Sequence, residues 1–334
     1  MRDTSRTHRP GTGTGTDADD ASASAYAAED PASAYAAYDP ASAVPELASA
    51  VPGLAELAPI VRDFTLACDG EILSCTEAAP RFGSPADARP DVPAPNPTAL
   101  VLHGAGNGDK QSPGVLAAHL AARGHRALAF DFSGHGASTG KLGELSLRRR
   151  FEQARAVVDR RVPADSPLLL VGYSMSGQTV ADLATHYGPR VAAVGLGAPA
   201  VYAAEAWPVA FDAGFTGIIR TPDSWRKSPA LGAFRALPVG VRAVLATPAV
   251  DAVIPPAVTE AVDEALSGSR AHYTRIVLPD ADHRLSLRFA SDADARNDFL
   301  NALLGQGRAA EAWGHRRAHS RDLVHDISYI APRT

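Results

Sequence analysis

One stretch, Ser166 to Thr179, constrains the fold of this chain more than any other; it reads SPLLLVGYSMSGQT. Leu168 to Val171 form a short continuous apolar run, which is typical of a strand buried on both faces of a parallel sheet. The small residues Gly172 and Ser176 flank Ser174 two positions away on either side, and a helix is predicted from Gln178 to Tyr187. This order is typical of a strained elbow that lifts a serine hydroxyl clear of a sheet. The alternative is a turn that merely joins a strand to a helix.

The rest of the chain alternates between apolar strands and helices. Further strands are predicted at 98–102, 125–130, 191–196, 241–246 and 273–278, and further helices at 113–122 and 145–162. Such alternation gives right-handed β-α-β crossovers and a mostly parallel central sheet with helices on both faces, an α/β fold. Any site lies at the carboxyl ends of the strands. Near the start, Asp69-Gly70 favours a tight turn, so an antiparallel hairpin is expected at the sheet edge.

Composition divides the chain into three parts. Its 334 residues, 46% hydrophobic, suffice for one large domain, which we expect at 59–306. Residues 1–58 repeat Ser-Ala-Tyr-Ala-Ala and hold few large apolar side chains, which predicts a disordered leader, with a docking segment as the alternative. Residues 307–334 have little periodicity and are predicted to be a tail.

Charge and cysteine usage exclude several classes of protein. A net charge of −5 gives no reason to expect a nucleic-acid partner.

There is no apolar signal-like segment and no uncharged apolar run of about 18 residues, which predicts a cytoplasmic protein without a membrane span. Cys68 and Cys75 are expected to be reduced thiols, although a disulfide across the hairpin is the alternative. No histidine or cysteine spacing indicates a metal site. The oligomeric state stays open.

Two glycine-containing loops follow predicted strands. In His103-Gly-Ala-Gly-Asn-Gly108, three glycines let the backbone approach a ligand where a carbonyl oxygen would need hydrogen-bond donors. A phosphate loop is disfavoured, because neither the Gly-Lys-Ser/Thr ending nor the G-x-G-x-x-G spacing occurs. The second loop reads DFSGHGAS, and we expect its Asp131 and His135 to be structural.

An acid and a base also follow strands near the same predicted edge. Asp251 lies in the loop after 241–246 and is favoured over three competing acids, Glu205, Asp212 and Asp223. His283 follows the last predicted strand, whereas His272 begins that strand and belongs to the opposite edge. The order Ser174, Asp251, His283 is the one that accompanies an elbow nucleophile.

Together these features resemble the α/β-hydrolase superfamily, and within it the esterase, monoacylglycerol-lipase and serine-aminopeptidase-like branch. The resemblance covers about residues 60–305 and rests on HGAGNG, DFSGHGAS, GYSMSG, the Asp251 loop and ADHR. Two positions depart from the pattern. Ser176 replaces the usual second glycine, and Thr247-Pro-Ala-Val precedes the acid where many relatives have Gly-x-x-Asp.

The resemblance implies a role for each matched residue. Ser174 would be the nucleophile, and His283 the general base and then the acid. Asp251 would fix the imidazole tautomer and stabilise its charged form. The main-chain N–H groups of Met175 and Ala105 would form the oxyanion hole.

The insertion at 199–236 is expected to form a small cap over the site. It is rich in aromatic residues, and four are predicted to bind substrate: Trp207, Phe211, Phe215 and Trp225. Apolar walls would favour an acyl chain or an aromatic or polyketide-like group. The alternative is that these aromatics only attach the cap to the body.

The sequence therefore predicts a serine hydrolase that cleaves a small-molecule ester, thioester or small amide through an acyl-enzyme, without a cofactor. One alternative uses the same triad for acyl transfer, lyase or cyclisation chemistry in a biosynthetic pathway. Another is a non-catalytic ligand-binding protein with the same fold.

Overall fold

A computed structural model describes residues 58–81 and 96–306 of the chain. These residues form an eight-stranded sheet with the order β1-β2-β4-β3-β5-β6-β7-β8. Strands β3 to β8 run parallel, while β2 pairs antiparallel with both β1 and β4. The strands are β1 (Ile60–Cys68), β2 (Glu71–Ala79), β3 (Thr98–Leu102), β4 (Ala127–Phe130), β5 (Leu168–Tyr173), β6 (Val191–Gly197), β7 (Arg242–Pro248) and β8 (His272–Leu278). The predicted α/β class, parallel sheet and edge hairpin are confirmed.

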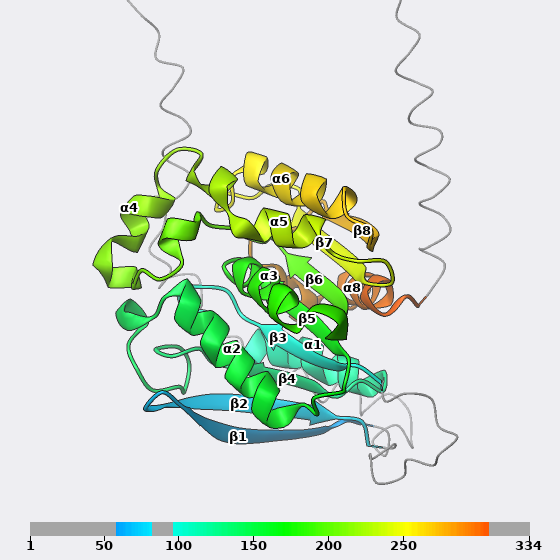
Figure 1. Cartoon of the computed structure of the whole chain (residues 1–334). Coiled ribbons are helices and arrows are strands. Elements are labelled where there is room, and N and C mark those ends of the chain that lie inside the picture. The colour runs from blue at the N-terminus through cyan, green and yellow to red at the C-terminus, as the bar shows by residue number, and fades with distance from the viewer. Residues whose placement is uncertain (1–57, 82–95, 307–334) are drawn as a thin grey trace, which may run out of the picture.

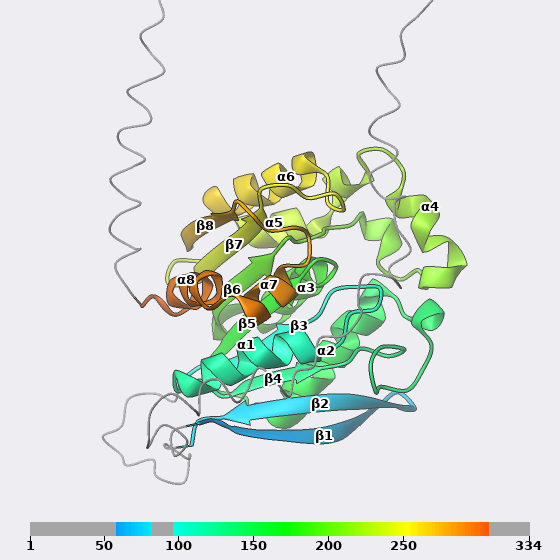
Figure 2. The ribbon, with the colours of Figure 1, turned by 180° about the vertical axis from the view of Figure 1, so that it is seen from behind.

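Helices cover both faces of the sheet (Figures 1 and 2). One face carries α1 (Gln111–Ala122), α7 (Leu285–Ser291) and α8 (Ala293–Leu304); the other carries α2 (Leu147–Arg161), α3 (Ser176–Tyr187), α5 (Pro229–Arg235) and α6 (Pro256–Ser267). Alternate residues of the central strands pack into two hydrophobic cores, one on each face of the sheet. Leu100 and Leu102 of β3 pack toward α2 and α3, whereas Ala99 and Val101 pack toward α1. Strands buried on both faces explain the continuous apolar runs in the sequence.

The edge hairpin forms as its turn predicts. Asp69 and Gly70 both have positive φ, 47° and 80°, the left-handed conformation that this two-residue turn needs. The register places Cys68 opposite Glu71 and Cys75 opposite Phe64, so the two cysteines do not face each other. Both thiols are buried and unpaired, and burial raises the pKa of Cys75 to about 12.

Element boundaries differ from prediction by a few residues. Helix α3 begins at Ser176, because Met175 is already helical directly after the turn. Strand β4 begins at Ala127 rather than at residue 125, because the N–H of His125 donates to the carbonyl of Leu120 and closes α1.

The segment between β6 and β7, which includes the predicted cap, is a series of short helical turns. They are Ala204–Ala206, Phe211–Phe215, α4 (Thr216–Ile219), Ser224–Lys227 and α5. Figures 1 and 2 show α4 standing away from the sheet. The chain from 204 to 215 is attached to the start of α2: Arg148 donates its N–H to the carbonyl of Trp207, and Phe211 donates to that of Leu145. The cap boundaries stay a prediction; the tail and all of the leader but Ala58 lie outside the described residues.

Candidate active site

Ser174 occupies a strained turn between β5 and α3. Its φ is +52°, a left-handed value that is uncommon for a residue with a side chain. Three main-chain hydrogen bonds hold it there: its N–H donates to Gly197, and its carbonyl accepts from Gly177 and Ala200, at 2.8–3.0 Å. A methyl carbon at Gly172 would lie 2.7 Å from the carbonyl oxygen of Ser176, which explains the glycine before the turn.

A continuous chain of hydrogen bonds joins three side chains that are distant in sequence. The Nε2 of His283 lies 2.9 Å from Oγ of Ser174, and its Nδ1 lies 3.0 Å from Oδ2 of Asp251. An ionised carboxylate only accepts hydrogen bonds, so Nδ1 carries the proton and Nε2 is free to accept that of the serine. The imidazole and carboxylate side chains are 17% and 9% exposed, which leaves the base within reach of a small molecule.

Asp251 is fixed by its own loop. Its Oδ1 accepts the N–H groups of Val253 and Ile254 at 2.8 and 2.9 Å, which leaves Oδ2 for the imidazole. Burial by itself raises the pKa of this carboxyl group. The hydrogen bond and charge of His283, with the two N–H groups, outweigh burial and hold the pKa below its usual value. Asp251 is therefore ionised at neutral pH.

The alternative acids and the alternative histidine do not belong to this chain of hydrogen bonds. Glu205, Asp212 and Asp223 are exposed on the segment after β6, and Asp223 pairs with Arg226. His272 is exposed at the start of β8, whereas His283 follows the end of that strand. The parallel sheet thus separates the two histidines to opposite edges.

The loop after β3 approaches the elbow closely. A methyl carbon at Gly104 would lie 3.1 Å from Cβ and 3.7 Å from Oγ of Ser174, so only glycine allows this approach without displacement. Ala105, predicted to supply an oxyanion donor, follows directly and is half-buried. Met175, the other predicted donor, is 7% exposed and begins the turn into α3. The backbone of the loop after β3 and that of the elbow therefore both lie beside the Ser174 side chain.

Comparison with known proteins is consistent with this geometry. The profile of the family described as serine aminopeptidase, S33, matches residues 93–222. The thioesterase domain from the curacin biosynthetic pathway has a TM-score of 0.51 at 18% identity, over 71% of this chain and 98% of that one. The chain has the α/β-hydrolase fold.

Other solved structures share this fold. Est1E from Butyrivibrio proteoclasticus, solved with ferulic acid bound, has a TM-score of 0.53 at 16% identity and covers 73% of this chain and all of its own. The enol-lactonase from Burkholderia xenovorans LB400 has a TM-score of 0.50 at 20% identity, over 71% of this chain and all of its own. At these identities the likeness concerns the fold. A search of curated proteins found no match.

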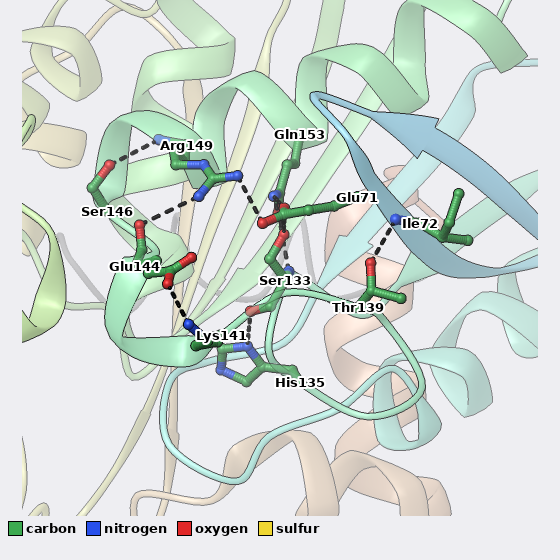
Figure 3. A network of polar contacts seen from close by, with 10 residues as sticks. All are labelled: Glu71, Ile72, Ser133, His135, Thr139, Lys141, Glu144, Ser146, Arg149 and Gln153. Carbon is green, nitrogen blue, oxygen red and sulfur yellow. Dashed lines mark hydrogen bonds and ion pairs between the residues drawn. The ribbon is translucent and has the colours of Figure 1, made fainter.

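The DFSGHGAS loop is held by structural contacts. The carboxylate of Asp131 accepts the N–H groups of Lys110 and Ala137, at 2.6 and 3.0 Å. Figure 3 shows a second set of contacts, in which Gln153 of α2 and Glu71 of β2 both bond Ser133. The buried His135 contacts the carbonyl of Ser133 through Nδ1, at 3.0 Å. These contacts tie the loop to the hairpin and to α2, in agreement with the structural roles expected for Asp131 and His135.

A partly buried polar network connects α3 to the segment after β6. Asp182 accepts the indole N–H of Trp207 at 3.0 Å and the amide N–H of Gln178 at 2.9 Å. The carbonyl oxygen of Gln178 in turn accepts from the N–H of Tyr202 and the hydroxyl of Ser228. Burial raises the pKa of Asp182 to about 6, although both hydrogen bonds oppose the shift. Sequence reasoning missed this network, because its polar residues carry no motif.

The four predicted substrate residues fall into two pairs. Phe215 and Trp225 are 3% and 8% exposed and belong to the core below the segment, which favours the alternative that they attach it to the body. Trp207 and Phe211 are half-buried. Contact of any of the four with substrate stays a prediction.

Two further expectations concern metals and membranes. Within residues 58–81 and 96–306, no three His, Cys, Asp or Glu side chains gather in a group that could hold a metal ion. No helix in the same ranges has the length and apolar character to cross a membrane. The cytoplasmic location stays a prediction.

Proposed function

We propose that this protein of α/β-hydrolase fold is a serine hydrolase that cleaves a small-molecule ester, thioester or small amide through an acyl-enzyme on Ser174. The single observation that carries the proposal is the unbroken relay from Oγ of Ser174 through His283 to Asp251, at 2.9 and 3.0 Å. A serine hydroxyl is a weak nucleophile unless a base accepts its proton, and this geometry supplies the base and the group that orients it.

Acylation would proceed in two steps. Oγ of Ser174 attacks the substrate carbonyl carbon while Nε2 of His283 takes its proton, and Asp251 stabilises the resulting imidazolium. The N–H groups of Ala105 and Met175 would donate to the oxyanion, each contributing about 10²- to 10³-fold in rate. When the tetrahedral intermediate collapses, Nε2–H protonates the departing alcohol, thiol or amine, and the acyl group stays on Ser174.

Deacylation would reverse these roles. A water molecule takes the place of the leaving group, His283 removes its proton, and the hydroxide attacks the acyl carbon. Collapse of the second intermediate returns the proton to Oγ of Ser174 and releases the acid. Protein groups and water account for every proton in the cycle, so the proposal names no cofactor.

Substrate class is supported by two kinds of observation. The half-buried Trp207 and Phe211 give the segment after β6, which we propose to cap the site, an apolar, aromatic character. Three structural neighbours also point to carbonyl compounds. Two are named as a thioesterase and an enol-lactonase, and the third was solved with ferulic acid bound. We therefore propose an ester or thioester with an apolar or aromatic acyl group as the preferred substrate.

A fluorophosphonate probe tests the nucleophile. We expect the probe to label the folded protein at Ser174, as located by peptide mass spectrometry, and not to label Ser174→Ala. A folded protein that leaves Ser174 unlabelled, and that hydrolyses no member of a chromogenic ester panel of graded chain length, would contradict the proposal and favour a ligand-binding protein. Release of a trapped acyl group by water, rather than by an added alcohol or amine, separates hydrolysis from acyl transfer.

A further inference from the structure

Arg150 lies on α2, directly behind the elbow, and is completely buried at 0% exposure. We propose that Arg150, acting through Ser176, is a positioning residue that fixes the oxyanion loop against the nucleophile elbow. This inference rests on the proposed function, because it assigns Arg150 a task in the same site.

A closed set of hydrogen bonds joins three segments at this point. Nη2 of Arg150 donates to the carbonyl oxygen of His103 at 2.9 Å and to Oγ of Ser176 at 2.8 Å. The hydroxyl of Ser176 itself donates to the same carbonyl at 2.6 Å. Helix α2, the loop after β3 and the first turn of α3 therefore share one buried cluster. This contact explains why a serine stands where the pattern usually has glycine: its hydroxyl points to the oxyanion loop.

The cluster also fixes one particular peptide plane. The carbonyl of Gly104 and the N–H of Ala105 belong to the same trans peptide unit, so they point in opposite directions. The Gly104 oxygen accepts Nδ1–H of His103 at 2.8 Å and lies 3.4 Å from Nη2 of Arg150. Nδ1 of His103 carries the proton, because its Nε2 accepts the N–H of Phe132 at 3.1 Å. Holding the oxygen on the buried side directs the N–H of Ala105 the other way.

The electrostatic setting of Arg150 indicates a task beyond packing. Its guanidinium carbon lies 3.7 Å from the centroid of the Phe132 ring, and no carboxylate of the described residues forms an ion pair with it. Its Nε and Nη1 have no hydrogen-bond partner among those residues. Burial lowers its pKa to about 9, which leaves it protonated at neutral pH. A buried cation without a counterion is costly, and here its charge would favour an oxyanion formed on the substrate beside the adjacent loop.

The experiment compares substitutions behind the elbow in the full chain. In Arg150→Met and Ser176→Ala we expect kcat on a chromogenic ester to fall about 10- to 100-fold, with KM changing less than about threefold, because the oxyanion donors lose alignment. Affinity for a trifluoromethyl ketone, which forms a tetrahedral oxyanion on the serine, should fall by a similar factor. Arg150→Lys, which keeps the charge, should recover part of the loss. Arg155→Met is the matched control on the same helix, since its side chain is 43% exposed, and it should behave as wild type.

Folding of each variant is checked by near-ultraviolet circular dichroism. If Arg150→Met does not fold, Ser176→Ala decides, because it removes only a hydroxyl. Folded Ser176→Ala or Arg150→Met that keeps both kcat and ketone affinity within twofold of wild type would overturn the inference. Failure of wild type to react with the fluorophosphonate overturns the proposed function instead, so the two outcomes are distinguishable.

Discussion

The two sides of the nucleophile elbow differ in how they hold charge. On the open side, Asp251 and His283 come from loops after β7 and β8, are partly exposed, and are joined by one hydrogen bond that the carboxylate accepts. On the buried side, Arg150 comes from a helix, is 0% exposed and has no carboxylate partner among the described residues. Under the proposed function, the groups that exchange protons lie on loops and are joined by a hydrogen bond, whereas the residue proposed to set the geometry is fixed inside the core.

The comparison is tested most severely at Ser174, where the two sides meet. Ser174→Ala should lower kcat by about 10⁶-fold, because loss of the nucleophile in a comparable triad has an effect of that size. The measurement is kcat for the preferred ester in an end-point assay. Ser267→Ala, an exposed serine on α6, is the control and should keep full activity. Full activity in Ser174→Ala would remove the reason for treating the two sides as one site.

On the open side, Asp251→Asn should lower kcat by about 10⁴-fold at neutral pH. The amide would donate to Nδ1 of His283, which places the imidazole proton on Nε2 and leaves no acceptor for the serine. The measurement is kcat for the same ester, with Asp212→Asn as a control because Asp212 is an exposed competing acid. A large loss of kcat in Asp212→Asn, with none in Asp251→Asn, would show that Asp212 is the acid that orients His283.

Between the two sides, Gly104→Ala should lower kcat by about 10-fold or more while leaving the fold intact. The added methyl carbon would lie 3.1 Å from Cβ of Ser174, so the oxyanion loop must move away from the elbow. Gly114→Ala on α1 is the matched control, since nothing lies within 4 Å of its added carbon. We expect that control to be as active as wild type and slightly more stable, by up to about 1 kcal/mol. Equal kcat in the two variants would show that the loop position is not critical.

The smallest effect is expected at Asp182, which extends the buried side toward the segment after β6. Its folded pKa, about 6, lies above the usual aspartate value, so the folded state binds the proton more tightly. The contribution of this group to the unfolding free energy should therefore be largest below about pH 4 and fall as pH rises toward and through 6, by roughly 1–3 kcal/mol. Urea titrations from pH 4 to 7 should show this slope reduced in Asp182→Asn relative to wild type. An unchanged slope in the variant would assign it to other groups.

Much of the fold and of the candidate site could be predicted, because each signal is local. Asp69-Gly70 specified the hairpin turn, and the apolar run before Ser174 specified a central strand. Asp251 and His283 were found because residues after parallel strands share one edge of the sheet. The serine at 176 was recognised as a departure, but the direction of its hydroxyl depends on a carbonyl that is 73 residues away. The network at Asp182 was missed for the same reason.

By itself, the sequence determined the alternation of strands and helices, the elbow, and the order of serine, acid and base, since neighbouring residues decide each of these. Only the tertiary structure decided which arginine of α2 enters the core. Arg148, Arg149 and Arg150 are consecutive and chemically identical, yet their side chains are 50%, 25% and 0% exposed. Successive residues of a helix point about 100° apart, so the packing of α2 against α3 and the β3 loop selects one of them.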